Sequence, residues 1–263
     1  MPANRIAVSA LKLEAVKGPS GPRPLYDFNQ KDNVENCILM SDEHIGGSSK
    51  SHLDFVTNPS PSTTTTTTTT TTSSPPPPSS EPTAYARFHG SISTALPQDK
   101  PSIKRSGYAA FRTPDQQPTL FGRSVWDIDP YSYLALRIRS DGRSYLVNVQ
   151  TEGVEPTDLH QHRLFAKRPG EWETVLVGWN DLVRTSYGFV VEPQTELLRQ
   201  KVTTVGIGLT DRVEGPFELC IERVWATNRV EEGDTVLSKA GGEESAVGGK
   251  GSLKTKKGES VHW

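Results

Sequence analysis

Residues 134–150 read LALRIRSDGRSYLVNVQ, and this stretch decides the fold. Large apolar side chains occupy every second position on both sides of a central Asp141-Gly142 pair. A period of two places successive side chains on opposite faces of a β-sheet. An Asp-Gly pair between two such runs is typical of a tight turn between paired strands. We therefore expect two antiparallel strands joined as a hairpin.

Similar alternation extends over residues 84–228, on both sides of this stretch. Further strands are expected where apolar side chains alternate between Gly or Pro residues, at 84–89, 107–112, 172–176, 205–209 and 217–221. Only residues 195–200, with Thr195 as N-cap, have a helical pattern. Because no helical crossovers separate the strands, the pattern favours an all-β antiparallel sandwich or jelly roll over a parallel α/β fold.

One ordered domain is expected at 25–230, flanked and interrupted by segments of biased composition. Within it, the apolar islands at 25–28 and 37–40 should add strands to the same sandwich. Residues 59–83 are rich in Thr, Pro and Ser and include an unbroken threonine run, so we expect a solvated loop inserted in the domain. Residues 1–24 are either a weak targeting sequence or a frayed end, and residues 231–263 are expected to be a disordered tail.

Charge and cysteine content exclude several classes of protein. The 263-residue chain carries 29 Lys and Arg against 31 Asp and Glu, with the signs interspersed, which indicates no nucleic-acid partner. Cys37 and Cys220 are too few for a disulfide scaffold and lack metal-ligand spacing, which fits a reducing compartment. No run approaches the roughly 18 apolar residues of a membrane-spanning helix. Membrane association is therefore expected to be peripheral at most.

The common sequence motifs of catalysis are missing from the chain. Neither G-x-x-x-x-G-K-[ST] nor a G-x-G-x-x-G turn opening a helix occurs, and Gly206-Ile207-Gly208 is a lone G-x-G within an expected strand. H-E-x-x-H and G-x-S-x-G are also absent, so zinc peptidase and α/β-hydrolase chemistry have no support. We therefore assign no catalytic residue and no cofactor, and expect a protein that is not an enzyme.

Two polar clusters could in principle hold a metal ion. His160 and His162 would share one face of a strand, but no third ligand is identifiable, and a polar solvent face explains them as well. Residues 42–44, Asp-Glu-His, could bind calcium in a sandwich loop, whereas the neighbouring glycines at 46–47 are explained by the backbone path alone. We assign no metal site to either cluster.

Aromatic side chains could form a platform on which a sugar ring stacks. Alternation cannot tell which of them are buried, so packing in the core is the default expectation. The candidates for such a platform are Tyr85, Tyr131, Tyr133, Trp179 and Tyr187.

Seven short motifs follow one another along the strand region. They are SDEHIGGSS (41–49), ARFHG (86–90), GYAAFRT (107–113), LALRIRSDGRSY (134–145), PGEWE (169–173), VGIGL (205–209) and GPFEL (215–219). Together they resemble the thirty-kilodalton complex I intermediate-associated protein family, over residues 25–230 apart from the threonine tract. The resemblance implies a galactose-binding-like jelly roll.

The same resemblance implies a function and a location. It implies a mitochondrial factor, on the matrix side of the inner membrane, that associates with an assembly intermediate of the complex I membrane arm and with other assembly factors. The family has no established catalytic residues, so the resemblance assigns none. The residues that contact a partner protein stay unknown.

Three functions can be distinguished by structure. A binding scaffold for assembling subunits should present an exposed apolar or aromatic patch. The alternative, a carbohydrate-binding module on the same sandwich, would be favoured by a concave face lined by Tyr or Trp together with carboxylates. An unrecognised enzyme is the third possibility, for which the sequence names no base, nucleophile or metal set.

Overall fold

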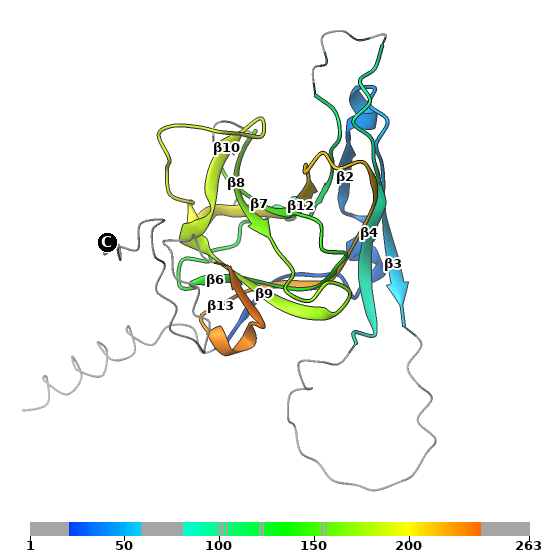
Figure 1. The fold of residues 1–263 in the computed structure, drawn as a ribbon. Coiled ribbons are helices and arrows are strands. Elements are labelled where there is room, and N and C mark those ends of the chain that lie inside the picture. Colours follow the sequence, from blue (N-terminus) through cyan, green and yellow to red (C-terminus); the bar gives the residue numbers. More distant parts are fainter. Residues whose placement is uncertain are drawn as a thin grey trace, which may run out of the picture.

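The structure is a computed structural model, which describes residues 21–58 and 81–237 apart from positions 99, 101, 102, 104, 121, 123, 154 and 156. These residues form two β-sheets packed face to face as a sandwich (Figure 1). The all-β fold class is therefore confirmed. The threonine tract, most of the expected N-terminal segment and most of the expected tail lie outside the described residues.

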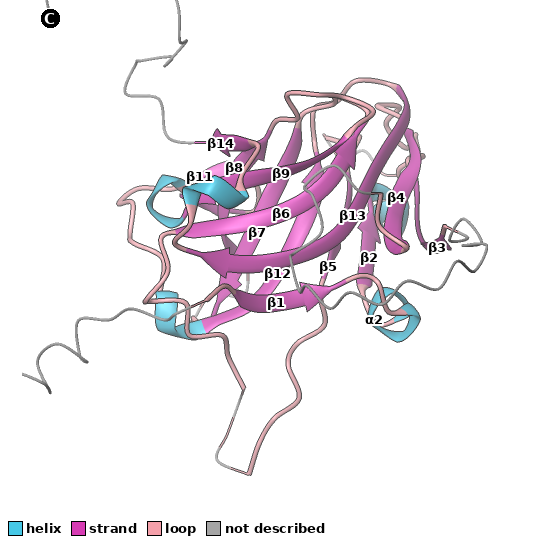
Figure 2. Cartoon of the chain, turned by 90° about the horizontal axis from the view of Figure 1, so that it is seen from below, coloured by secondary structure: helices cyan, strands magenta, loops and turns pink. Residues whose placement is uncertain are grey.

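The first sheet has the strand order β14-β9-β6-β13-β4-β3, and β1 pairs with β13 (Figure 2). Neighbouring strands are antiparallel except for β14 and β9, which are parallel. Its strands are β1 (Arg23–Asp27), β3 (Lys50–Thr57), β4 (Ala84–Ile92), β6 (Tyr133–Ser140), β9 (Trp172–Gly178), β13 (Gly215–Thr227) and β14 (Thr235–Leu237).

The second sheet has the order β11-β10-β8-β7-β12-β5-β2, and all of its pairs are antiparallel. Its strands are β2 (Ile38–Ser41), β5 (Ala109–Arg112), β7 (Tyr145–Thr151), β8 (Asp158–Leu164), β10 (Val183–Ser186), β11 (Phe189–Val190) and β12 (Val202–Leu209). Short helical segments occupy connections between strands: α2 (Lys31–Glu35) and the 3-10 turns η1 (Asp42–Ile45), η2 (Trp179–Asp181), η3 (Arg199–Lys201) and η4 (Val230–Glu232).

The stretch 134–150 forms β6 and β7, but the expected hairpin is wrong. β6 pairs with β9 and β13 in the first sheet, whereas β7 pairs with β8 and β12 in the second. The Asp141-Gly142 turn therefore carries the chain across the sandwich. Leu136 of β6 and Val147 of β7 are both buried in the core. Two strands with one apolar face each can bury those faces against each other across a core, so alternation does not require them to be neighbours in one sheet.

The core lies between the sheets and consists largely of the alternating apolar positions. Phe88 of β4 packs against Phe111 of β5 with ring centroids 5.0 Å apart, which joins the first sheet to the second. Edge-on aromatic pairs of this kind add about 0.5–1.5 kcal/mol beyond the area they bury. The expected strands at 84–89, 107–112, 172–176, 205–209 and 217–221 are confirmed, as are strands at the islands 25–28 and 37–40.

Residues 195–200 do not form the expected helix. Leu197 packs into the core from an extended segment, and only the short turn η3 follows it. The structure adds β3, β8, β10 and β11, which the alternation did not indicate. Burial of a single Leu side chain on a connection competes successfully with the weak helical preference of six residues.

The first part of the expected tail is also part of the fold. Residues 231–237 contribute to η4 and form β14, which pairs with β9. Asp234 anchors this segment, since its carboxylate accepts a hydrogen bond of 2.7 Å from the Thr174 amide and its own amide donates to the Thr174 carbonyl. Among the described residues, no helix is long and apolar enough to cross a membrane.

Candidate functional site

A pocket of about 460 Å³ lies on the outer face of the second sheet. Its floor is made by positions that alternate with core residues on β5, β7 and β12, where Ala110 and Leu146 flank Gly208. A side chain at Gly208 would place its Cβ 3.0 Å from the Asn148 amide nitrogen, so glycine leaves the space above the sheet open for the pocket. The lining residues are Met40, Arg105, Ser106, Gly107, Tyr108, Ala110, Leu146, Asn148, Leu159, Gln161, Tyr187, Gly188, Phe189, Gly208, Thr210 and Arg212.

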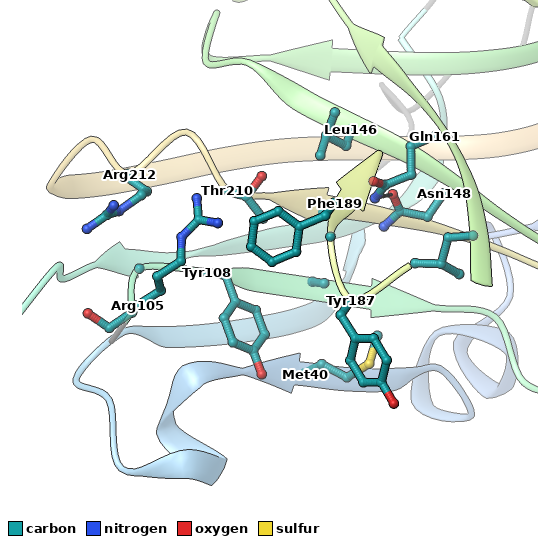
Figure 3. Close-up of a pocket in the computed structure, with 16 residues that line it drawn as sticks. Met40, Arg105, Tyr108, Leu146, Asn148, Gln161, Tyr187, Phe189, Thr210 and Arg212 are labelled. Atoms are coloured by element: carbon teal, nitrogen blue, oxygen red, sulfur yellow. Dashed lines mark hydrogen bonds between the residues drawn. The ribbon is translucent and has the colours of Figure 1, made fainter. Parts of the chain in front are cut away.

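Aromatic side chains from two separate segments form the walls of the pocket (Figure 3). Tyr187 and Phe189, from the β10–β11 turn and β11, are 79% and 57% exposed. Tyr108 precedes β5 on the other side and is partly buried, and burial raises the pKa of its phenol. The walls thus offer flat apolar surface that is not used in the core.

Two amide side chains lie beside the floor. The Gln161 amide donates to the Asn148 carbonyl oxygen at 2.7 Å, and the Gln161 oxygen accepts from the Thr185 hydroxyl at 2.9 Å. These bonds fix the orientation of both amides, because each oxygen has a donor. The Asn148 nitrogen has no hydrogen-bond partner within the described part of the chain, so its N–H groups remain available to a carbonyl oxygen in the pocket.

The charged groups at the pocket are both arginines. Arg105 lies over the Phe189 ring at 5.1 Å, and Arg212 follows β12 on the loop that leads to β13. No Asp or Glu is among the residues that line the pocket in the described structure. The site therefore has positive charge and no carboxylate to balance it.

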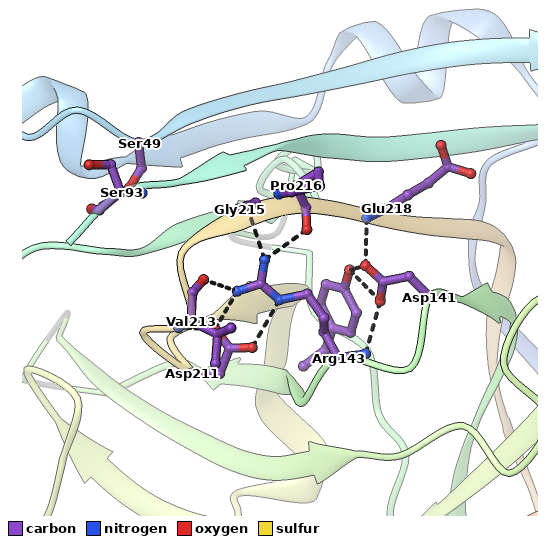
Figure 4. A network of polar contacts seen from close by, with 10 residues as sticks. Ser49, Ser93, Asp141, Arg143, Asp211, Val213, Gly215, Pro216 and Glu218 are labelled. Atoms are coloured by element: carbon purple, nitrogen blue, oxygen red, sulfur yellow. Dashed lines mark hydrogen bonds and ion pairs between the residues drawn. The ribbon is translucent and has the colours of Figure 1, made fainter.

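A buried polar network holds the loop that carries Arg212 (Figure 4). Arg143 donates two hydrogen bonds to Asp211, at 2.7 and 3.0 Å, and others to the carbonyls of Val213, Gly215 and Pro216. Both side chains of this ion pair are more than four-fifths buried. Bidentate pairs of this kind are geometrically specific as well as strong. The network thus uses the Asp211 carboxylate internally and leaves the neighbouring Arg212 without it.

Asp141 fixes the other side of this network. Its carboxylate accepts from the Tyr145 hydroxyl at 3.1 Å, and from the backbone amides of Arg143 and Glu218. Burial, and then the nearby Asp141 charge, raise the pKa of Tyr145, so this phenol stays protonated. The DGRSY part of the decisive stretch therefore joins the ends of the sheets and does not line the pocket.

The Asp42 cluster has a structural role in this fold. Asp42 is fully buried, and its carboxylate accepts from the Ser49 amide and hydroxyl and from the Gly107 amide. A Cβ at Gly47 would overlap the Asp42 carboxyl group, which explains the glycine. The cluster thereby positions the segment that bears Arg105 and Tyr108. No group of three or more His, Cys, Asp or Glu that could hold a metal ion occurs in the described ranges.

The two histidines of β8 do not form a shared site. His160 is buried, and burial lowers its pKa, whereas the ring of His162 hydrogen-bonds the Arg163 carbonyl at 2.7 Å. They are two positions apart on β8, but His160 is buried whereas His162 is partly exposed, and the two rings have different partners.

Of the aromatic candidates, only Tyr187 lines the pocket. Tyr85, Tyr131 and Trp179 are buried, and Tyr133 packs beside the cluster of Ala135, Leu176 and Trp225. Sequence reasoning missed Tyr108, Phe189 and the two arginines, because Phe189 lies in the short edge strand β11 and the others lie on connections. The G-x-G at 206–208 was the available signal, since glycines at outward positions of a central strand leave a hollow on the sheet face.

Comparison with known proteins gives consistent matches. The family model for Complex I intermediate-associated protein 30 matches residues 26–221. A protein of Neurospora crassa named "Complex I intermediate-associated protein 30, mitochondrial" is 52% identical, over 98% of this chain and 89% of its own length. The mouse protein of that name is 26% identical, over 79% of this chain and 60% of its own length.

Solved structures share the fold at low sequence identity. A family 11 carbohydrate-binding module from Clostridium thermocellum, in complex with a β-1,3-1,4-mixed-linked tetrasaccharide, is 11% identical with a TM-score of 0.50. The superposition covers 80% of this chain and 97% of the module. The likeness shows that the sandwich is a galactose-binding-like fold and shows nothing about ligands.

Proposed function

The chain belongs to the Complex I intermediate-associated protein 30 family, and on this premise we propose that it is a non-catalytic factor in the assembly of mitochondrial respiratory complex I. Its action is to bind an assembly intermediate of the membrane arm, in the company of other assembly factors. The proposed location is the matrix side of the inner membrane, in keeping with the mitochondrial names of the relatives.

The observation that carries this proposal is the pocket on the second sheet. Exposed Tyr187 and Phe189, together with two arginines that have no ion pair in the described ranges, are suited to holding a partner, because aromatic and Arg side chains dominate the energetics of protein interfaces. Neither a pair of acids with opposed roles nor a nucleophile with a base lines the pocket in the described structure. Binding without chemistry is the function that this geometry supports best.

A deletion experiment tests the proposal. Mitochondria from cells that lack the gene are solubilised, separated on a native gel, stained for NADH dehydrogenase activity and probed for membrane-arm subunits. We expect loss of full-size complex I and accumulation of subassemblies, both restored by the intact gene. Normal complex I in the deletion strain contradicts the proposal.

Glycan binding is the second candidate, because the pocket has exposed aromatic rings on a galactose-binding-like sandwich. The carboxylates expected beside such a platform are not among its lining residues. Titration of the purified protein with a neutral mixed-linked β-glucan oligosaccharide, followed by calorimetry, tests this candidate. Saturable binding that is lost on Tyr187→Ala would favour it.

A further inference from the structure

Two residues with left-handed backbone lie at the pocket. In the part of the chain that the structure describes, two residues other than glycine have positive φ, Tyr187 at 51° and Arg212 at 56°, and both line the pocket. They come from separate loops, the β10–β11 turn and the β12–β13 connection. Left-handed backbone is unfavourable for most residues other than glycine. Tyr187 and Gly188 are the central pair of the two-residue turn between β10 and β11, which requires positive φ at both positions, so this turn accounts for Tyr187. What bears on binding is that the two loops bring the Tyr187 and Arg212 side chains to one pocket.

The charge of the pocket indicates what it binds. Neither Arg105 nor Arg212 has an ion pair among the described residues, and Figure 3 shows both guanidinium groups on the same side of the pocket. Arg105 is held in place by its contact with the Phe189 ring. A planar guanidinium matches the two oxygens of a carboxylate. Two arginines do not suffice for a nucleic acid, which is held by many phosphate contacts.

The remaining lining indicates the kind of molecule that carries the carboxylate. The Asn148 N–H groups can donate to a main-chain carbonyl, and Tyr187 and Phe189 offer flat apolar surface beside them. A volume of 460 Å³ lies in the range of clefts that take a small ligand, about 300–1,000 Å³. A short extended segment of polypeptide fits these groups.

We propose that the pocket binds an extended segment of the partner polypeptide, with an Asp or Glu side chain held by Arg105 and Arg212 and a neighbouring apolar side chain packed on Phe189 and Tyr187. This inference rests on the proposed function and specifies the chemistry of the partner. The amide of Asn148 binds the main chain of the segment, and the aromatic rings exclude water from the ion pairs.

Peptide libraries test the proposal with the full chain. The immobilised protein is offered an equimolar mixture of two degenerate heptapeptide libraries, one with Asp and one with Asn at the central position, and retained peptides are sequenced. We expect the Asp library to be enriched by about tenfold or more over the Asn library, because charge-assisted hydrogen bonds to the two arginines give a preference of this size. Apolar residues should be enriched next to the Asp. Equal enrichment, or no retention of either library, overturns the proposal.

Matched variants separate the pocket from general charge and from folding. Arg105→Gln with Arg212→Gln should abolish the preference for Asp, whereas the exposed Arg163→Gln outside the pocket should not. Tyr187→Asn should weaken retention and at the same time raise the Tm, because Asn tolerates left-handed backbone. Phe165→Ser removes an exposed aromatic ring outside the pocket, and it should leave peptide retention unchanged. Loss of retention with an unchanged or raised Tm excludes misfolding as the cause.

Rescue of the deletion strain distinguishes failure of the pocket inference from failure of the proposed assembly function. If the intact gene restores complex I and the Arg105→Gln and Arg212→Gln variant restores it equally well, the assembly function stands and the pocket inference fails. If the deletion strain has normal complex I, the proposed function itself fails. Tighter binding of the neutral β-glucan oligosaccharide than of any retained peptide also overturns the inference.

Discussion

On the outer face of the first sheet, Arg139 lies beside the packed rings of Tyr85 and Trp172, 5.6 and 5.5 Å from their centroids, and both rings are buried. On the outer face of the second sheet, Arg105 lies over Phe189 at 5.1 Å, and ring and guanidinium are exposed. The two faces carry the same kinds of side chain. On the first face the aromatic rings pack within the chain, whereas on the second they remain open to solvent.

Residue type alone therefore does not identify a binding surface. Arg137 on the first face forms an ion pair with Asp234, and Arg87 pairs with Glu218, so carboxylates of the chain itself satisfy these cations. The arginines of the pocket lack such partners in the described ranges. We therefore expect substitutions on the first face to change stability and substitutions in the pocket to change binding.

The largest effect is expected for Trp172→Ala. The side chain is 7% exposed and packs edge-on against Tyr85 at 5.1 Å, so its removal should lower the free energy of unfolding by about 3–5 kcal/mol. Urea unfolding at pH 7.5 measures the change. Tyr187→Ala, which truncates an exposed ring of the pocket, should change it by less than about 0.5 kcal/mol. Equal losses in the two variants would remove the distinction between the faces.

The two glycines of β12 sharpen the comparison within the second sheet. A Cβ at Gly206 would lie 2.5 Å from the Phe111 carbonyl oxygen on the neighbouring strand, so Gly206→Ala should cost about 1–3 kcal/mol. At Gly208 the nearest atom is the terminal nitrogen of the Asn148 side chain, 3.0 Å away, which can shift slightly more easily than a backbone atom. Gly208→Ala should therefore cost less while narrowing the pocket. Thermal unfolding of both variants tests the order, and a larger loss at Gly208 would show that the floor is rigidly packed.

A pair of arginine substitutions compares the two cations directly. Arg139→Gln removes a guanidinium that contacts two buried rings and should lower the free energy of unfolding by about 1–2 kcal/mol. Arg105→Gln removes an exposed guanidinium and should change the free energy of unfolding by less than about 0.5 kcal/mol. Chemical denaturation at low and high salt measures both. A destabilised Arg105→Gln protein would mean that this arginine supports the fold as well.

The smallest expected effect is on the pH dependence of the free energy of unfolding, through His160 in the second sheet. Burial lowers the pKa of His160, so the folded state favours the neutral ring while the unfolded chain takes up a proton below about pH 6.5. Stability contributed by this group is present above that pH and is lost as the pH falls toward the folded pKa. His160→Gln should flatten the decrease in unfolding free energy between about pH 7 and pH 5. The same slope in both proteins would show that another group titrates there.

The strands were predictable where alternation is strong, and the pocket was not. Residues 84–89 and 205–209 alternate over several positions, so their faces could be assigned without neighbours. The helix expected at 195–200, which does not form, shows the limit, because the burial of Leu197 decides that segment. Tyr108 and Phe189 stand in short loops or an edge strand whose position depends on Asp42 and on the β10–β11 turn.

By itself, the sequence determined the fold class, most strands, the family resemblance and the lack of known catalytic motifs, since these depend on local periodicity and on short runs of residues. Tertiary structure alone decided that β6 and β7 belong to different sheets. Two strands bury the same alternating side chains whether they face each other across a core or pair side by side in one sheet, so the pattern cannot distinguish the two arrangements. It also decided which arginines have a carboxylate partner among the described residues. Arg139 and Arg105 differ in the neighbours that packing brings to them, and those neighbours come from distant parts of the chain.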